Sequence, residues 1–218
     1  MVTRGQLLER PVVIPTARGE CLDGIYLRGE ALPLLVASPL PGAGGSMQHP
    51  VLNELAYAAA LSGRASLRLD YRGVGASEGA LSTDLAHAVE DLREGVIHLL
   101  DTVRTGAVAV AGWDTGCWVA LALARVEPRV ERVALIAPSD QPAPAGVPGW
   151  AELAPLPILV VAPVPEVERD HRAQRDRLRG GAANVRVELI QSPDRTLREG
   201  LGSLQRIVPP FLGAERRA

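Results

Sequence analysis

Aromatic residues are scarce in this chain of 218 residues: they make up 3% of it, although 47% of the residues are hydrophobic. A core must therefore be built from leucine, valine and alanine, and the length suits one domain or two. The two cysteines, Cys21 and Cys117, show no metal-ligand spacing, so neither a disulfide framework nor a zinc site is expected. We expect no metal and no cofactor.

The chain also has no excess of positive charge, because its formal net charge is -2. It therefore lacks the basic surface charge that is typical of a nucleic-acid-binding protein. The N-terminus MVTRGQLLERPV has no apolar signal core. No apolar run reaches the roughly 18 to 20 residues that span a membrane. We therefore expect a cytoplasmic protein that binds neither nucleic acid nor a membrane. The abundance of alanine, arginine, glycine and proline is typical of a GC-rich bacterial genome.

Short apolar runs alternate with helical segments from Leu32 onward, and most runs are apolar at every position, as in strands of a buried parallel sheet. The predicted strands are Val12–Pro15, Cys21–Arg28, Leu32–Ser38, Ala65–Leu69, Ala107–Ala111, Arg132–Ala137, Ile158–Ala162 and Val185–Ile190. The predicted helices are Pro50–Leu61, a long helix from Ser82 or Asp84 to about Val103, Cys117–Val126, Glu166–Leu178, and a closing helix carrying Leu197, Leu201, Leu204, Val208 and Phe211. We predict a single α/β domain over residues 1–218, with about eight strands and helices on both faces of the sheet.

The long helix carries two stripes of side chains. Its apolar stripe is predicted to face the core and consists of Leu85, Val89, Leu92, Val96 and Leu99. Its polar stripe is predicted to face away from the core and consists of His87, Asp91, Glu94 and His98.

The segment Ala107–Val119, AVAVAGWDTGCWV, predicts a strand, a tight turn and a helix in succession. Gly112 and Gly116 flank the turn, where a side chain would collide with the neighbouring strand and helix. This is the pattern of a nucleophile elbow, Gly-x-Ser-x-Gly, which exposes its middle residue at the top of a sheet. Asp114 stands where the serine would be.

Two further motifs accompany the elbow. The first is Gly44-Gly45-Ser46-Met47 in a Pro/Gly-rich loop, and the second is the ten-residue stretch DYRGVGASEG, residues 70–79. With these motifs, the chain from about Leu32 to Phe211 resembles the α/β-hydrolase fold, in particular the small bacterial hydrolases that lack a large cap. The 19 residues of Ser139–Pro157 are too few for such a cap. The resemblance implies esterase, peptidase or thioesterase chemistry by a serine, an acid and a histidine in that chain order.

All three positions of that triad differ in this sequence. In the family the acid follows the seventh predicted strand, where the nearest carboxylates are Glu166 and Glu168; Asp140, after the sixth, is a weaker match. The family histidine follows the last strand, where this chain has Arg195, and no histidine lies beyond His171. A guanidinium stays protonated at neutral pH, so Arg195 cannot take a proton from water.

Each substituted residue has more than one interpretation. Asp114 is either a nucleophile, as aspartate is in the related haloalkane dehalogenases and epoxide hydrolases, or the N-cap of the helix that follows. Those relatives carry a helical cap, and the halide-binding tryptophan of the dehalogenases follows the aspartate, whereas Trp113 precedes it. Arg195 has three interpretations: it pairs with Asp114, it binds an anionic ligand, or it is solvated. His49 is the histidine that could act as a substitute base, whereas His171 is expected to be solvated.

The loop Pro41–Ser46, including Pro41 and Gly42, and the amide of Thr115 lie where an oxyanion hole would form, so we predict that the site binds a carbonyl or carboxylate group. Trp113, Arg195 and His49 are the other predicted binding residues, and Cys117 is expected to pack inside its helix. We interpret the chain as a non-catalytic pseudohydrolase that binds a small molecule or supports a protein partner, as a homo- or heterodimer. The alternative is a hydrolase of ester-type small molecules that uses Asp114 or a serine outside the elbow, Ser38 or Ser139.

Overall fold

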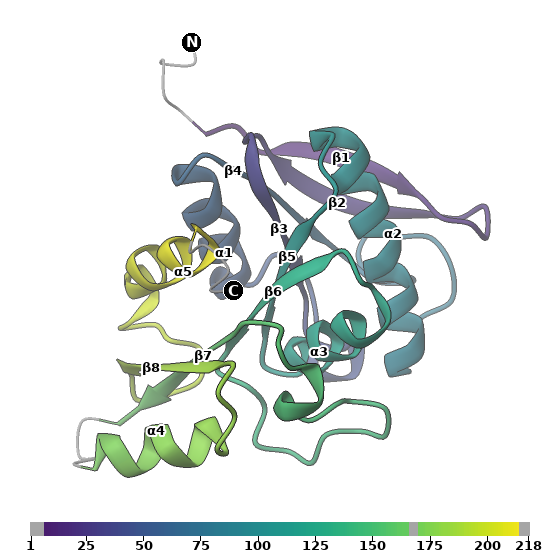
Figure 1. Ribbon diagram of the computed structural model, residues 1–218. Helices are drawn as coiled ribbons and strands as arrows, with labels where there is room; N and C mark the ends of the chain where they lie inside the picture. The colour runs from purple at the N-terminus through teal and green to yellow at the C-terminus, as the bar shows by residue number, and fades with distance from the viewer. Residues whose placement is uncertain (1–6, 166–169, 214–218) are drawn as a thin grey trace.

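The apolar runs form the strands of one eight-stranded sheet in the computed structural model, which describes residues 7–165 and 170–213 (Figure 1). The strands are β1 Arg10–Pro15, β2 Cys21–Leu27, β3 Ala31–Ala37, β4 Arg64–Leu69, β5 Val108–Trp113, β6 Val130–Ile136, β7 Ile158–Val164 and β8 Val185–Gln191. The α-helices are α1 Pro50–Leu61, α2 Leu85–Val103, α3 Gly116–Val126, α4 His171–Arg179 and α5 Leu204–Gly213. None of these helices is long and apolar enough to cross a membrane.

The order of the strands across the sheet is β1-β2-β4-β3-β5-β6-β7-β8. The first two strands form an antiparallel hairpin, and β2 is also antiparallel to β4. Every other neighbouring pair is parallel. The predicted α/β architecture with a mostly parallel sheet is confirmed. Residues 139–157 contain only one short 3-10 turn, Trp150–Leu153, so no large cap stands over the sheet.

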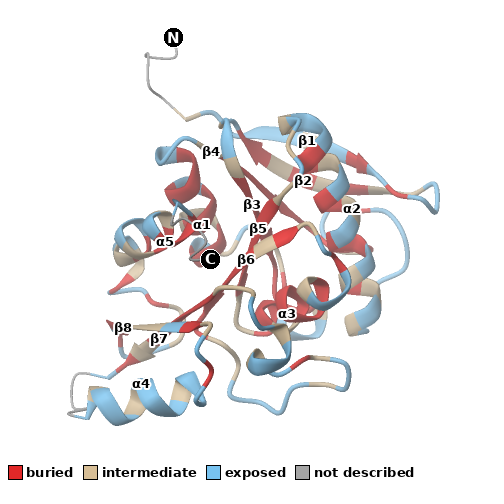
Figure 2. Ribbon diagram, viewed as in Figure 1, coloured by how far each residue is buried: buried red, intermediate tan, exposed pale blue. Residues whose placement is uncertain are grey.

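The sheet is covered on both faces by helices, and its central strands are buried over most of their length (Figure 2). Val110 and Leu35 pack with α2 and α3 in one hydrophobic cluster. Their neighbours Ala109 and Val36 point to the opposite face and pack with α1 and α5 in a second cluster. Each fully buried leucine or valine in these layers stabilises the fold by about 1.5–3 kcal/mol.

The two sequence motifs that accompany the elbow lie against each other. Oδ1 of Asp70 accepts a hydrogen bond of 2.7 Å from the backbone N–H of Met47. Gly75 adopts a φ of +58°, and a side chain there would push against the same carboxylate. Burial raises the pKa of Asp70, while the Met47 N–H opposes that shift. These contacts fix the Pro/Gly-rich loop beside the carboxyl ends of β3 and β4.

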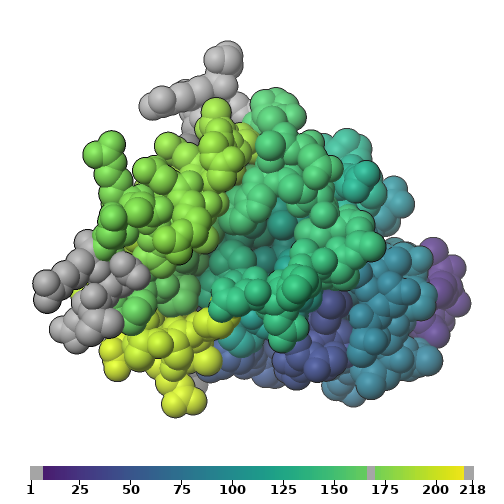
Figure 3. Space-filling model, turned by 90° about the horizontal axis from the view of Figure 1, so that it is seen from below, coloured from purple at the N-terminus to yellow at the C-terminus, as the bar shows by residue number. Residues whose placement is uncertain are grey.

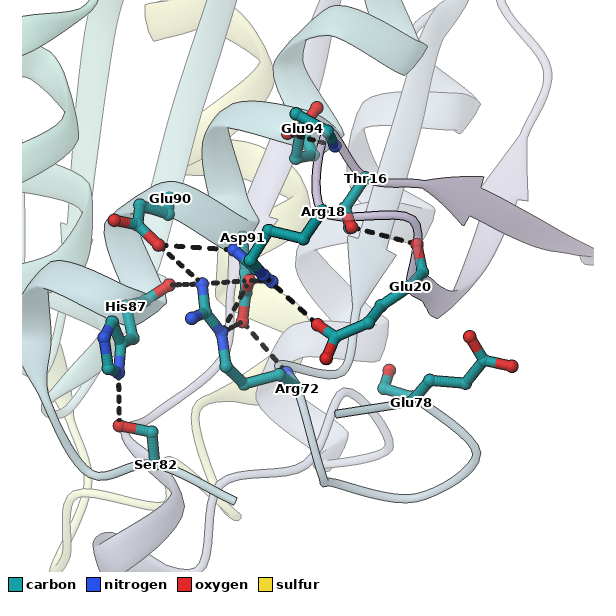
Figure 4. A network of polar contacts seen from close by, with 12 residues as sticks. Thr16, Arg18, Glu20, Arg72, Glu78, Ser82, His87, Glu90, Asp91 and Glu94 are labelled. Carbon is teal, nitrogen blue, oxygen red and sulfur yellow. Dashed lines mark hydrogen bonds and ion pairs between the residues drawn. The ribbon is translucent and has the colours of Figure 1, made fainter. Parts of the chain in front are cut away.

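The polar stripe of α2 does not face away from the folded protein at Asp91, where the prediction is wrong, whereas His87, Glu94 and His98 are half-buried. Asp91 is fully buried, because the β1–β2 turn and the segment after β4 fold over this side of the helix. Its carboxylate accepts hydrogen bonds from the backbone N–H and the guanidinium of Arg72 and from the guanidinium of Arg18 (Figure 4). The predicted cap of α2 is confirmed, since Asp84 accepts a hydrogen bond from the N–H of Ala86.

The last two helices begin later than the sequence pattern predicts. α5 starts at Leu204, and Leu197 lies before it with a φ of +55°, a conformation that no helix accommodates. Leu197 is nevertheless buried in the α1 and α5 cluster, which explains why its spacing matches that of the helix. α4 starts at His171 with Asp170 as its N-cap. Glu166 and Glu168, the predicted acids, lie outside the described residues.

Candidate functional site

The turn between β5 and α3 has the geometry of a nucleophile elbow. Asp114, at its apex, has a φ of +51°, a left-handed conformation that is strained for most residues other than glycine and that aspartate and asparagine adopt more readily than the rest. A side chain on Gly116 would place its Cβ 2.5 Å from the carbonyl oxygen of Ala37, and one on Gly112 would overlap the start of α3. The glycines are therefore required by close packing, as the sequence predicts.

The carboxylate of Asp114 does not cap the helix that follows it. The N-cap of α3 is Thr115, and no side chain makes a capping hydrogen bond there. The Asp114 side chain is 25% exposed and points instead toward Arg195, whose Nη2 lies 3.4 Å from its Oδ1. The interpretation of Asp114 as an N-cap is wrong, and its left-handed backbone serves to aim the side chain outward.

Arg195 follows β8 and reaches across the carboxyl ends of the strands to the elbow. Its Nη2 donates a hydrogen bond of 2.7 Å to the carbonyl oxygen of Ala137 and a shorter one to that of Pro138. Its Nη1 lies 2.5 Å from Oδ2 of Asp140, an exposed carboxylate. The guanidinium is 30% exposed and is paired with two carboxylates of the protein itself, Asp114 and Asp140.

His49 and Trp113 form the wall beside the carboxylate of Asp114. Their rings are stacked, with centroids 3.6 Å apart and planes inclined by 15°. Trp113 donates its indole N–H to the carbonyl oxygen of Arg195 over 2.9 Å, which anchors the segment that carries the guanidinium. His49, Trp113, Asp114 and Arg195 are thus gathered in one place, as a shared site requires.

The protonation of His49 is set by its position at the start of α1. Its Nδ1 accepts a hydrogen bond of 3.3 Å from the backbone N–H of Val51, so in the neutral ring the proton sits on Nε2. Burial lowers the pKa of His49, while the nearby carboxylate of Asp114 opposes that shift. Within the described residues no hydrogen bond joins His49 to Asp114. A neutral His49 is consequently a donor at Nε2 with no free lone pair, which is unfavourable for a general base.

The backbone donors beside the elbow are only partly free. The N–H of Leu40, at the start of the loop after β3, donates to the hydroxyl of Thr115 over 2.9 Å in a buried position. Pro41, the next residue, has no N–H to offer, and Gly42 is exposed on the following 3-10 turn. The N–H of Thr115 itself has no partner among the described residues. Thr115 therefore presents its own N–H to the site, whereas its hydroxyl engages the N–H of Leu40.

The remaining candidates are held in structural contacts. Ser38 is buried and donates its hydroxyl to the carbonyl oxygen of Leu69. Cys117 is buried with its thiol directed at the carbonyl oxygen of Gly112, and burial raises its pKa, so the thiol stays protonated. Ser139 accepts only a local contact from the N–H of Gln141. No group of side chains able to hold a metal ion occurs in the described part of the chain.

One contact between a serine and a histidine was not predicted from the sequence. The hydroxyl of Ser82 lies 2.8 Å from Nδ1 of His87. The same hydroxyl accepts the N–H of Asp84, so the pair belongs to the start of α2. The spacing of a serine five residues before a histidine was the available signal, and the contact is explained by the turn that caps the helix.

Comparisons with known proteins agree with this geometry. The profile of the alpha/beta hydrolase family matches residues 40–216. Among curated proteins no sequence matches the chain. A solved lidless a/b serine hydrolase from Xanthomonas campestris is 23% identical, with a TM-score of 0.74 over 99% of both chains. An alpha-beta serine hydrolase homologue from Coxiella burnetii is 21% identical, with a TM-score of 0.73 over 98% of this chain and 100% of that one. An esterase from Pyrococcus furiosus is 16% identical, with a TM-score of 0.69 over 97% and 96%.

Proposed function

This chain belongs to the alpha/beta hydrolase family, and we propose that it is a non-catalytic member, a pseudohydrolase that binds a small molecule or supports a protein partner. Hydrolysis in this fold needs a nucleophile at the elbow and a histidine that activates it, with an acid that orients the histidine. Here the elbow carries Asp114, and the segment after β8 brings Arg195 to it.

The ion pair between Arg195 and Asp114 carries the proposal. A carboxylate attacks a substrate carbon with a lone pair, and a guanidinium held beside it attracts that negative charge and lowers its nucleophilicity. Arg195 also follows the last strand, where the resemblance expects the family histidine, and it is anchored by the carbonyl oxygens of Ala137 and Pro138. Since an arginine does not release its proton at neutral pH, no base is supplied from this side.

His49 does not replace the missing base. Taking a proton from water would require its Nδ1 lone pair, which already accepts the N–H of Val51 at the start of α1. An ester formed on Asp114 would therefore persist, because neither Arg195 nor His49 activates the water that must cleave it.

A binding role is supported by the donors that remain. The N–H of Thr115 and the Nε2–H of His49 offer hydrogen bonds beside the aromatic surface of Trp113. The Asp114 carboxylate favours a neutral carbonyl-containing ligand over a carboxylate, since two anions repel each other at short range. A single-domain organisation, a protein partner, a cytoplasmic location and a bacterial source stay predictions from the sequence.

The alternative is a hydrolase of ester-type small molecules that uses Asp114. The strained backbone at Asp114 and its partly exposed side chain favour this second candidate, because such strain is common where a nucleophile is displayed. The alternative requires Arg195 to swing away from the elbow and a water to be activated by a group other than Arg195 and His49.

Intact-mass measurement tests the proposal. Wild type and Asp114→Asn are incubated with short alkyl halides and with p-nitrophenyl esters, and the mass of each protein is followed while product is assayed. Asparagine keeps the size of the side chain and tolerates the left-handed backbone. The proposal expects neither a covalent adduct nor turnover. Turnover by wild type that is lost in Asp114→Asn would establish the alternative, and a persistent adduct confined to Asp114 would show a nucleophile that lacks its base.

A further inference from the structure

Helix α4 concentrates positive charge at one end of a protein whose net charge is -2. Its nine residues, HRAQRDRLR, contain four arginines and one aspartate, and none of them is buried. The helix lies outside β8 at the lower edge of the molecule in Figure 1, and Figure 3 looks at the protein from that side. This charge lies apart from the elbow and takes no part in the site described above.

The arginines of α4 are divided between two flanks of the helix. Arg172, Arg175 and Arg179 are three and four residues apart, so they lie on one flank. Together with Val187 of β8 and Asp176, they line a groove of about 300 Å³ between the helix and the edge of the sheet. Arg177 is displaced by about half a turn and does not line the groove.

The guanidinium groups along the groove are available for a ligand. Arg172 and Arg175 make no ion pair or hydrogen bond with any residue that the structure describes. Arg179 donates its Nε to the carbonyl oxygen of Val185, which fixes its stem against β8 and leaves its terminal nitrogens without an acceptor among the described residues. Asp176 offsets one positive charge of the three, so the lining stays cationic. By contrast, Arg195 beside the elbow and Arg72 against α2 are paired with carboxylates.

The chemistry of the groove points to phosphate. All 23 basic residues of this chain are arginines, and a guanidinium binds phosphoryl oxygens through two parallel hydrogen bonds. The rise of the helix places Arg172 about 4.5 Å from Arg175 along its axis, and Arg175 about 6 Å from Arg179. Adjacent phosphoryl groups of one molecule can contact successive arginines at such spacings. A single carboxylate would leave one or two of them unpaired.

We propose that the groove between α4 and β8 binds a small molecule that carries two linked phosphoryl groups, held by Arg172, Arg175 and Arg179. The volume of the groove suits a compact ligand and is at the lower end of the range of small-molecule sites. Long nucleic acids are a different class of partner, and the net negative charge of the chain disfavours them.

Titration calorimetry with inorganic pyrophosphate tests this site in the full-length protein at low ionic strength. The double variant Arg172→Ala, Arg175→Ala is compared with Arg177→Ala, which removes a charge from the other flank of the same helix. Alanine favours helix, so both variants are expected to fold, and circular dichroism checks that they do. We expect pyrophosphate to bind wild type, and the double variant to bind it at least about 10-fold more weakly. Arg177→Ala should change the affinity less than about 3-fold, by long-range charge alone.

Four results would overturn the proposal. Absence of heat with pyrophosphate at millimolar concentration would show that no such site exists. Equal weakening in Arg177→Ala and in the double variant would show general attraction to a basic helix. Tighter binding of a short oligonucleotide than of pyrophosphate would assign the arginines to a nucleic acid. Orthophosphate serves as the second ligand, and binding equal to that of pyrophosphate would contradict the need for two phosphoryl groups.

Discussion

Nη2 of Arg195 lies 3.4 Å from Oδ1 of Asp114, although 81 residues separate the two positions in the chain. The contact brings together the last segment of the fold and the apex of the β5–α3 turn. It places a permanent cation against the carboxylate that occupies the nucleophile position.

Replacing Arg195 with alanine is expected to lower the free energy of unfolding by about 1–3 kcal/mol, because two backbone carbonyls and Asp114 lose a charged donor. The side chain is 30% exposed, so solvent replaces part of what is lost. Urea denaturation measures the change. Arg198→Ala serves as the control, since Arg198 is an exposed arginine of the same segment and should change the unfolding free energy by less than about 0.5 kcal/mol. Equal effects of the two variants would show that the pairing of Arg195 contributes nothing to stability.

Replacing Thr115 with valine should leave the buried N–H of Leu40 without an acceptor. An unsatisfied buried donor costs about 1–3 kcal/mol, and valine matches the shape of threonine closely enough to isolate that loss. Thr115→Ser keeps the hydroxyl and should retain most of the stability. Amide hydrogen exchange at Leu40 gives a local readout: faster exchange in Thr115→Val than in Thr115→Ser is expected, and unchanged exchange would contradict the hydrogen bond.

His49 should titrate below the ordinary value of histidine, about 6.5, because burial lowers its pKa. The folded protein then binds fewer protons than the unfolded chain over this interval. The contribution of His49 to stability is therefore full above about pH 6.5 and is lost as the pH falls through the folded-state pKa. NMR titration of the ring protons measures the pKa directly.

Asp114 raises the pKa of His49, opposing the effect of burial. Asp114→Asn removes that charge, so the pKa of His49 is expected to fall further in the variant than in wild type. His98 is the internal control. Burial also lowers its pKa, but the opposing carboxylate is Asp101, so the pKa of His98 should not change in Asp114→Asn. A rise in the pKa of His49 in Asp114→Asn would contradict the proximity of the two residues.

Replacing Asp91 with asparagine should destabilise the fold by about 3 kcal/mol, because the variant leaves Arg72 without its buried anion. Glu90→Gln is the matched control: Glu90 is the preceding residue and contacts the same two arginines, Arg18 and Arg72, but it is exposed. Its loss is expected to cost less than about 1 kcal/mol. Thermal or urea unfolding of both variants distinguishes the buried contact from the exposed one.

Sequence patterns were sufficient for the parts of the fold that depend on neighbouring residues. The uniformly apolar runs indicated the parallel strands, and Gly112 and Gly116 indicated the elbow because close packing leaves no room for a Cβ there. The closing helix shows the limit of such patterns. Leu197 has the spacing of a helical residue and is buried with the helix, yet its backbone is left-handed.

The contacts that sequence patterns could not predict join residues far apart in the chain. Asp91 has the spacing of a solvent-facing residue, and only the folding of Arg18 and Arg72 over α2 buries it. The hydroxyl of Thr115 meets the amide of Leu40 from 75 residues away. Nothing in the local sequence indicates such pairings. The residues of the candidate site could therefore be proposed from the sequence. The hydrogen bond that already engages the N–H of Leu40 could not be predicted.

The most direct test of whether the protein is non-catalytic is an assay of p-nitrophenyl acetate and butyrate hydrolysis. Purified wild type is assayed beside Asp114→Ala and Asp114→Ser. The p-nitrophenolate released is followed against a blank that contains buffer alone. We expect wild type and Asp114→Ala to release p-nitrophenolate at the same slow rate, which is the nonspecific rate of any folded protein surface. Wild-type turnover well above background that disappears in Asp114→Ala would rule out a pseudohydrolase and make Asp114 a catalytic residue.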